Sequence, residues 1–183
     1  MTVLTKPRMT VDEYLAWAVG RGGRYELFQG EVFAMSPKTV GHLKAKGAVY
    51  LALGAGIRQK GLPCHVLPDG ATIRIDEHTA YEPDATVYCE EELSPTAIEV
   101  PNPVIIVDVL SPSTRRIDVS TKLAGYFRLP SLAHYIIIDL KQRVIVHHAR
   151  SAGDTILTRI VREGSIVLEP PGLALAVSDI FSA

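Results

Sequence analysis

The chain has 183 residues, of which 47% are hydrophobic, and its formal net charge is −1. This length and apolar fraction predict a single globular domain with one substantial core. No stretch reaches the roughly 18 apolar residues that a membrane-spanning helix needs, and no basic segment followed by an apolar one opens the chain. These features exclude membrane proteins and favour a cytoplasmic location.

The charges are separated along the chain. Lysines and arginines but no acidic residue lie between Glu31 and Asp69, whereas no basic residue lies between Arg74 and Arg115. A net charge near zero argues against a generic nucleic-acid-binding protein, but this separation is compatible with one basic surface and a separate group of carboxylates. A solvated helix face followed by an acidic loop at residues 90–92 explains the same pattern.

The two cysteines, Cys64 and Cys89, have no second thiol at the spacing of a metal site. We therefore expect free, buried or half-buried thiols, and neither a disulfide framework nor a zinc site.

The first elements are predicted by capping and turn signals. The spacing of Thr10 and Glu13 is that of a capping box, so a short helix should begin there and end at the glycines that follow Ala18. Two strands, over residues 24–28 and 31–35, flank Gln29-Gly30 and predict a tight hairpin with Glu26 in its first strand.

A second helix is expected from Thr39 to about Ile57, with His42, Lys44 and Lys46 on its polar side. A third should follow residues 111–114 and end near Leu129, before Pro130. Strands are expected over residues 64–67, 71–75, 85–88, 104–110, 134–140, 143–148, 155–161 and 165–168. These elements predict an α/β sandwich, a mixed sheet flanked by helices, with a right-handed crossover from Val104 to Asp139.

Asp108 is the most informative residue, because it lies inside the apolar run Val104–Leu110. Such a run is typical of a strand covered on both faces, where an ionised carboxylate is costly unless a cation or several donors meet it. If the strand after Asp84 is an antiparallel neighbour, Asp84 and Asp108 can hold the same ion, and the carbonyl oxygen of Val109 adds a third ligand. Alternatively, Asp108 caps the helix that follows residues 111–114.

These residues resemble the PD-(D/E)XK restriction-endonuclease-like superfamily and, within it, the Uma-type family of bacterial endonucleases. The resemblance follows most of the chain in order and rests on Tyr25–Glu31, His42, Tyr81–Asp84, Asp108–Thr114, Asp118, Lys122, Tyr126 and His134–Asp139.

The resemblance implies a restriction-endonuclease-like core and a DNA endonuclease that depends on Mg²⁺, with Mn²⁺ as an alternative ion. Asp84 and Asp108 would bind the metal, Glu26 would assist as a further acidic ligand, and a lysine would orient or polarise the attacking water. Asp108 stands where the family more often has glutamate. Leu110 occupies the usual lysine position, so Lys122 must substitute from the helix.

Four further residues are candidates for contact with the substrate: His42, Arg115, Arg116 and Tyr126. Each has a structural alternative, since a helix-surface histidine or an exposed arginine needs no function. In the same way Lys122 could merely pair with Asp118. His147 and His148 are neighbours on a strand and should point to opposite faces, so we interpret them as structural. Asp69, in Pro68-Asp69-Gly70, is predicted to belong to a turn.

A second hypothesis from another class keeps the fold but not the chemistry. In it the chain is a catalytically inactive nuclease-like module that binds nucleic acid or protein, and the departures at Asp108 and Leu110 mark lost catalysis. Divalent ions should stabilise a working site and should scarcely affect an inactive one. For the nuclease we expect DNA as the partner and a homodimer, with the apolar segment Leu173–Phe181 in a symmetric contact.

Overall fold

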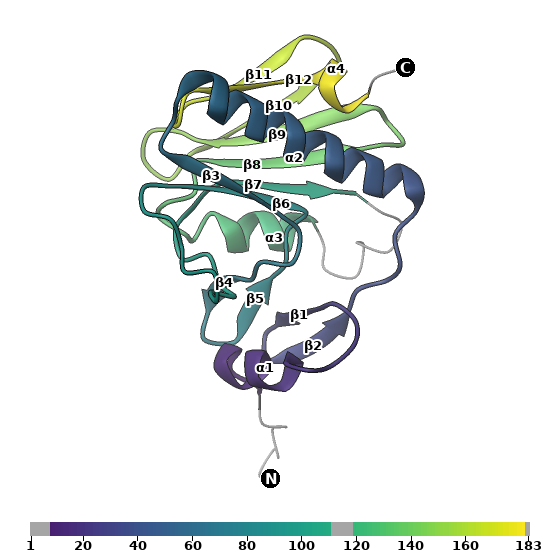
Figure 1. Ribbon diagram of the computed structural model, residues 1–183, viewed down its shortest axis with the longest axis vertical. Helices are drawn as coiled ribbons and strands as arrows, with labels where there is room; N and C mark the ends of the chain where they lie inside the picture. The colour runs from purple at the N-terminus through teal and green to yellow at the C-terminus, as the bar shows by residue number, and fades with distance from the viewer. Residues whose placement is uncertain (1–7, 111–118, 182–183) are drawn as a thin grey trace.

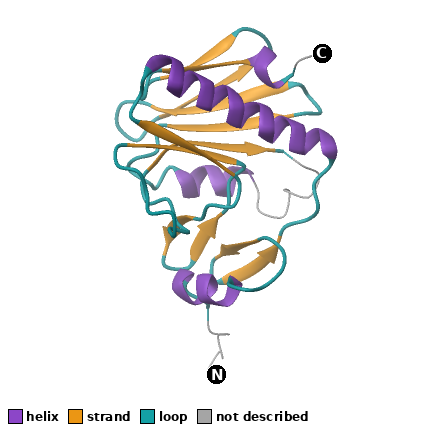
Figure 2. Cartoon of the chain, viewed as in Figure 1, coloured by secondary structure: helices purple, strands orange, loops and turns teal. Residues whose placement is uncertain are grey.

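The computed structural model describes residues 8–110 and 119–181, which form three sheets and four helices (Figures 1 and 2). The helices are α1 Val11–Ala18, α2 Val40–Lys60, α3 Val119–Tyr126 and α4 Val177–Ile180. The strands are β1 Tyr25–Phe28, β2 Glu31–Ala34, β3 Cys64–Pro68, β4 Ile73–Asp76, β5 Thr79–Tyr81, β6 Ala85–Cys89, β7 Pro103–Val109, β8 His134–Asp139, β9 Val144–Arg150, β10 Ile156–Val161, β11 Ser165–Leu168 and β12 Leu173–Ala176. Within the described ranges, no helix combines the length and apolarity needed to span a membrane.

A small N-terminal sheet carries Glu26. Its strand order is β2-β1-β5-β4, and α1 packs on it at the bottom of Figure 1. The predicted capping box at Thr10 and Glu13 is confirmed. The two-residue turn between β1 and β2 is also confirmed, because Gln29 and Gly30 both have positive φ, at 50° and 78°, as a type I′ hairpin turn requires.

The large sheet has the order β10-β9-β8-β7-β6-β3. Its pairs are antiparallel apart from β7 and β8, which are parallel and joined through α3, as the crossover prediction required. The antiparallel pairing of β6 with β7 is likewise confirmed. The start of the third predicted helix lies outside the described residues. Its end comes at Tyr126, three residues earlier than expected, because a turn separates α3 from Pro130.

The two faces of the large sheet have different covers. On one face α2, the long helix in front of the sheet in Figure 1, packs with the β11–β12 hairpin around an aliphatic core. On the other face α3 packs on a core rich in tyrosine. Glycine inside a helix is destabilising, but two glycines of α2 are explained by close packing. A Cβ on Gly54 would lie 3.2 Å from Val66 Cγ1, and one on Gly56 would lie 3.1 Å from Leu173 Cδ2.

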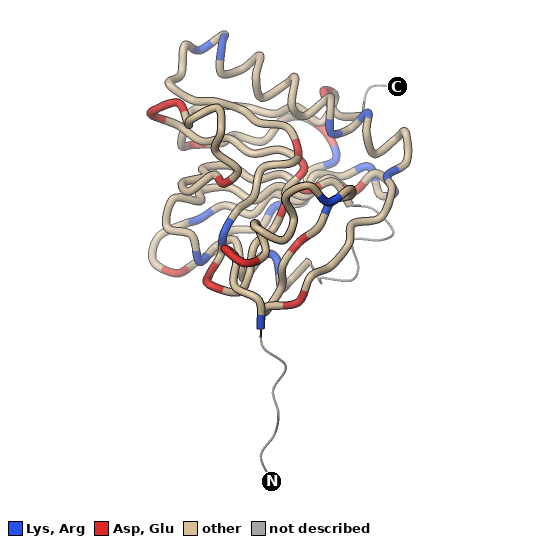
Figure 3. Tube along the Cα trace, turned by 60° about the horizontal axis from the view of Figure 1, so that its bottom comes forward, with Lys and Arg blue, Asp and Glu red and all other residues tan. Residues whose placement is uncertain are grey.

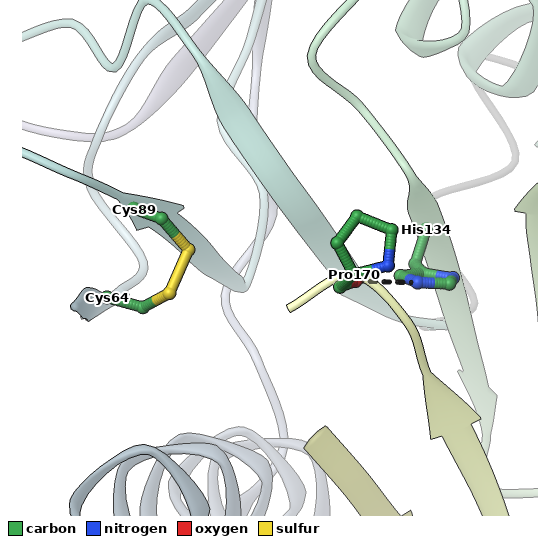
Figure 4. The surroundings of a disulfide bond; sticks show 4 residues. All are labelled: Cys64, Cys89, His134 and Pro170. Carbon is green, nitrogen blue, oxygen red and sulfur yellow. Dashed lines mark hydrogen bonds between the residues drawn. A yellow bond between two sulfur atoms is a disulfide. The ribbon is translucent and has the colours of Figure 1, made fainter. Parts of the chain in front are cut away.

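The two cysteines form a disulfide, which corrects the expectation of free thiols (Figure 4). Cys64 begins β3 and Cys89 ends β6, and the antiparallel register places the two residues opposite each other, with their Cα atoms 3.8 Å apart. The Glu90 amide donates to the Pro63 carbonyl beside them, so the pair is of the non-hydrogen-bonded kind, in which side chains lie closest. Strand register therefore joins two residues that are 25 positions apart in sequence.

The apolar side of the C-terminal segment packs within the chain. Leu173, Leu175 and Val177 are buried in the core under α2, so they are not available for the symmetric contact expected of residues 173–181. The loop before this segment is also tied down, because His134 Nε2 donates to the carbonyl oxygen of Pro170 at 2.9 Å (Figure 4).

Candidate active site

The two predicted metal ligands come together where β6 begins and β7 ends. Asp84 directly precedes β6, and its Oδ2 accepts a hydrogen bond of 2.7 Å from the backbone amide of Val109, the last residue of β7. Asp84 and Asp108 are each only 5% exposed. The antiparallel pairing of β6 and β7, which sets Ala85 opposite Val107, thus places both carboxylates at one end of the sheet.

Helix α2 supplies two side chains to Asp84. His42 and Lys46 are four residues apart and share the helix face that lies on the sheet. Lys46 Nζ lies 2.8 Å from Asp84 Oδ1, and His42 Nε2 lies 3.5 Å from Asp84 Oδ2. Burial alone would raise the pKa of Asp84, but His42, Lys46 and the Val109 amide outweigh burial and hold this pKa well below its usual range.

Helix α3 supplies the lysine that the sequence pattern lacks at Leu110. Lys122 Nζ lies 3.7 Å from Asp108 Oδ2 and 2.6 Å from Glu26 Oε1. Glu26 reaches the site from β1 and also accepts from the backbone amide of Glu82 at 3.1 Å. The structure therefore places Lys122 and Glu26 beside Asp108. Lys122 can thus take the place of the lysine that the family usually has at the position of Leu110. Asp118, the alternative partner of Lys122, lies outside the described residues.

The environment of Asp108 differs from that of Asp84. Its Oδ2 accepts a hydrogen bond of 2.8 Å from the hydroxyl of Tyr135 on β8. Burial, together with the negative charges of Asp84 and Glu26, raises the pKa of Asp108 to about 6 despite Lys122. The pKa of Lys122 is above its usual range, because the attraction of Asp108 and Glu26 outweighs the effect of burial. The pKa values of the two carboxyl groups are thus shifted in opposite directions, an arrangement typical of functional sites.

A second set of charges connects the two sheets behind Asp84, and the sequence pattern indicated only part of it. Asp69 does lie in the predicted turn, but its carboxylate also binds Lys46 and Arg24. Arg24 in turn binds Glu82. The expectation that His42 and Lys46 share the polar side of their helix with Lys44 is wrong, since the side chains of His42 and Lys46 are buried and only that of Lys44 is exposed. The spacing of four residues between His42 and Lys46 was the available signal. Along the described chain as a whole, Figure 3 shows basic and acidic segments interleaved, not gathered on separate sides.

The remaining candidate residues lie in different surroundings. Tyr126 is 0% exposed and packs between the rings of Tyr81 and Tyr135. Within the described part of the chain its hydroxyl has no hydrogen-bond partner. Tyr126 is a core residue and presents no surface to a substrate, contrary to the expectation. Arg115 and Arg116 lie outside the described residues. His147 and His148 point to opposite faces as predicted: His147 contacts His134, and His148 contacts Thr158.

The side chains at this site fit a hard divalent cation. In residues 8–110 and 119–181 no group of three or more His, Cys, Asp or Glu has the arrangement of a metal site. A cation here would accordingly rest on Asp84 and Asp108, with water and backbone oxygen completing its shell. Magnesium suits such a site, since it commonly takes one or two carboxylates and keeps several waters. The negative charges of Asp84 and Glu26 help to raise the pKa of Asp108, and a bound cation would offset them, which supports this fit.

Comparisons with known proteins show the family and the fold of the chain. Two relatives come from Synechocystis sp. (strain ATCC 27184 / PCC 6803 / Kazusa) and are named uncharacterized proteins slr1290 and sll1609. The first is 25% identical over 177 residues, 96% of this chain and 92% of its own length. The second is 28% identical over 172 residues, 90% of this chain and 94% of its own length.

A crystal structure from Anabaena variabilis ATCC 29413, described as a putative nuclease belonging to DUF820, has the same fold. Its TM-score is 0.77 at 15% identity, over 95% of this chain and 98% of that one. The model of one family, Uma2, described as putative restriction endonuclease, matches residues 11–179, which include every site residue placed above. The chain belongs to the Uma2 family.

Proposed function

We propose that this chain is a DNA endonuclease that depends on Mg²⁺, or alternatively Mn²⁺, and hydrolyses phosphodiester bonds. The observation that carries the proposal is the meeting of Asp84 and Asp108 at one end of the sheet, with the ammonium group of Lys122 3.7 Å from Asp108. Membership of the Uma2 family and the fold shared with the Anabaena nuclease support it.

In this proposal Asp84 and Asp108 hold the cation, and the carbonyl oxygen of Val109 is a third ligand. When bound, the ion would neutralise charge on the phosphate and lower the pKa of a water molecule. Lys122 acts as a donor and not as a base, because its pKa is raised and the ammonium stays protonated at neutral pH. It can orient the attacking water or donate to a phosphate oxygen. Glu26, 2.6 Å away, fixes the position of Lys122.

The site also explains why Asp84 needs several partners. Its carboxylate must remain ionised and correctly oriented to bind a cation, and His42, Lys46 and the Val109 amide favour the ionised form. His42 is therefore assigned first to positioning Asp84, with contact to the substrate as a secondary role. Lys46 also binds Asp69 in the turn after β3, and Asp69 in turn binds Arg24 next to β1 of the small sheet.

The test is cleavage of supercoiled plasmid and of single-stranded DNA with Mg²⁺, Mn²⁺ or EDTA. Wild-type protein should cut in either ion and not in EDTA, and Asp84→Asn should be inactive with an unchanged circular dichroism spectrum. Lys44→Ala, on the exposed side of α2, is the matched control and should cut normally. Binding of DNA in EDTA, without cutting in either ion and with no cation binding by calorimetry, would favour the inactive module.

A further inference from the structure

Strand β10 forms one edge of the large sheet, and its outer side is open. It pairs with β9, and within the described residues no other strand pairs with it. Edge strands are usually protected by charge, proline or a cover. Here Leu157 is 56% exposed and Ile160 65% exposed, and the strand has one charged residue, Arg159.

The backbone groups that face outward follow from the pairing of β9. The amide of Arg150 donates to the carbonyl of Ala133 on the β8 side. The backbone N–H and C=O groups of Arg150, and of every second residue before it, therefore point towards β8. The amide of Ser151 donates to the carbonyl of Thr155, so Thr155 and every second residue after it face β9. Ile156, Thr158 and Ile160 therefore direct their N–H and C=O groups away from the sheet.

We propose that β10 pairs antiparallel with β10 of a second copy of this chain, about a twofold axis at Thr158. In this register Thr158 lies opposite Thr158 of the partner subunit, and Ile156 lies opposite the partner's Ile160. All three outward-facing residues then form hydrogen-bonded pairs. Their side chains share one face of the joined sheet, so the four isoleucines of the two strands contact each other in pairs.

Charge also favours this register. Asp154 precedes β10 and Arg162 follows it, so the twofold axis brings each aspartate near the arginine of the other copy. A slip in one direction would set Arg159 opposite the partner's Arg159, where like charges are destabilising. A slip in the other direction would set Ile160 opposite Asp154 of the partner. The register centred on Thr158 avoids both.

This dimer leaves the two sites separate. The two β10 strands run in opposite directions, and so do the two β7 strands. The ends of β7 that carry Asp108 therefore lie at opposite ends of the strands of the joined sheet. Asp84, Asp108, Lys122 and Glu26 of each site come from one chain. Loss of the dimer should therefore leave cleavage per chain unchanged, and this inference stands or falls independently of the nuclease proposal.

Sedimentation equilibrium of wild type and three variants tests the pairing. Ile160→Lys places two ammonium groups in the apolar contact. Thr158→Pro removes an outward N–H and keeps every backbone hydrogen bond to β9, although the side-chain hydrogen bond between Thr158 and His148 is lost. Val167→Lys is the control, because Val167 is 63% exposed on β11 and lies off this edge. Wild type and the control should be dimers, and both β10 variants should be folded monomers. A monomeric wild type at about 0.1 mM, or a dimer that survives both substitutions, overturns the proposal.

A cysteine scan tests the register. Opposed residues of a hydrogen-bonded pair have Cα atoms about 5.5 Å apart, within the range of a disulfide. Thr158→Cys should therefore form a covalent dimer when diamide is added, whereas Arg159→Cys, displaced along the strand from its copy, should not. The native cysteines are already bonded to each other. Cross-linking at position 159 in place of 158 would contradict the proposed register.

Discussion

Strands β7 and β8 are parallel neighbours with nearly the same sequence pattern and very different ends. Ile105-Ile106-Val107-Asp108 and Ile136-Ile137-Ile138-Asp139 each place an aspartate after three aliphatic residues. Asp139 ends its strand in a turn, half-buried, and its Oδ1 accepts from the backbone amides of Lys141 and Gln142 at 2.9 Å each. Asp108 is buried one residue before its strand ends.

The partners of the two aspartates explain the difference. Local backbone amides satisfy Asp139, so a turn is a sufficient reason for that residue. Asp108 depends on side chains from other elements, Lys122 on α3 and Tyr135 on β8, while nearby carboxylates raise its pKa. A buried carboxylate that its surroundings disfavour is not explained by stability, and it is therefore the better functional candidate.

The largest expected effect is on cleavage. Asp108→Asn should lower the rate of plasmid cleavage at least about a hundredfold, because a catalytic metal is worth several kcal/mol of transition-state stabilisation. Asp139→Asn should cut at the wild-type rate, since its amide oxygen can still accept both backbone bonds. Equal activity of the two variants would remove Asp108 from the proposed site.

Lys122 offers the next largest effect, measured by urea unfolding in EDTA. Lys122→Met leaves Glu26 and Asp108 buried without their cation, which should cost about 3–5 kcal/mol of unfolding free energy. Arg128→Ala, just beyond α3, breaks the more exposed pair with Asp76 and should cost about 1 kcal/mol or less. Glu26→Gln should recover part of the loss in Lys122→Met. Similar losses in the lysine and arginine variants would show that the Lys122 contacts are ordinary surface pairs.

Metal addition gives a smaller effect that does not depend on activity. Mg²⁺ at 100 times its Kd should stabilise wild type and Asp139→Asn by about 2.7 kcal/mol, or roughly 5–10 °C in Tm. Asp108→Asn should not respond. In EDTA above pH 6, Asp108→Asn should melt higher than wild type, because the raised pKa makes the ionised carboxylate destabilising. A wild type that ignores both Mg²⁺ and Mn²⁺ in thermal melts would support the inactive module.

Much of the fold could be predicted, because its signals are local. The capping box at Thr10, the Gln29-Gly30 turn and the apolar run around Asp108 each depend on a few adjacent residues. Lys122 was also found, though through the resemblance and not through spacing. Two of the short elements, β5 and β12, were missed because strands of three or four residues give little periodicity.

The features that escaped prediction depend on long-range register. The disulfide needs β3 and β6 to pair so that the first residue of one meets the last residue of the other. Lys46 reaches Asp84 and Asp69 only because α2 packs on a face of the sheet with its N-terminal half beside Asp84. From the sequence alone, a lysine between apolar residues of a helix can lie on the buried or on the exposed face. Only the packing of the helix on the sheet decides between the two.

The smallest effect concerns the other end of β8, where buried polar groups should affect stability and not catalysis. His134 donates through Nε2 to Pro170, so its Nδ1 accepts from His147 Nε2 at 2.9 Å, which requires the His134 ring to be neutral. Burial and the neighbouring charges lower the pKa of His147 to about 4. Between pH 6.5 and about 4 the unfolded chain therefore binds more protons, and stability should fall as pH falls through this window, by on the order of 2 kcal/mol. His147→Gln should flatten that dependence in urea unfolding and leave cleavage at neutral pH unchanged. A loss of cleavage with an unaltered pH profile would instead connect this end of β8 to the chemistry.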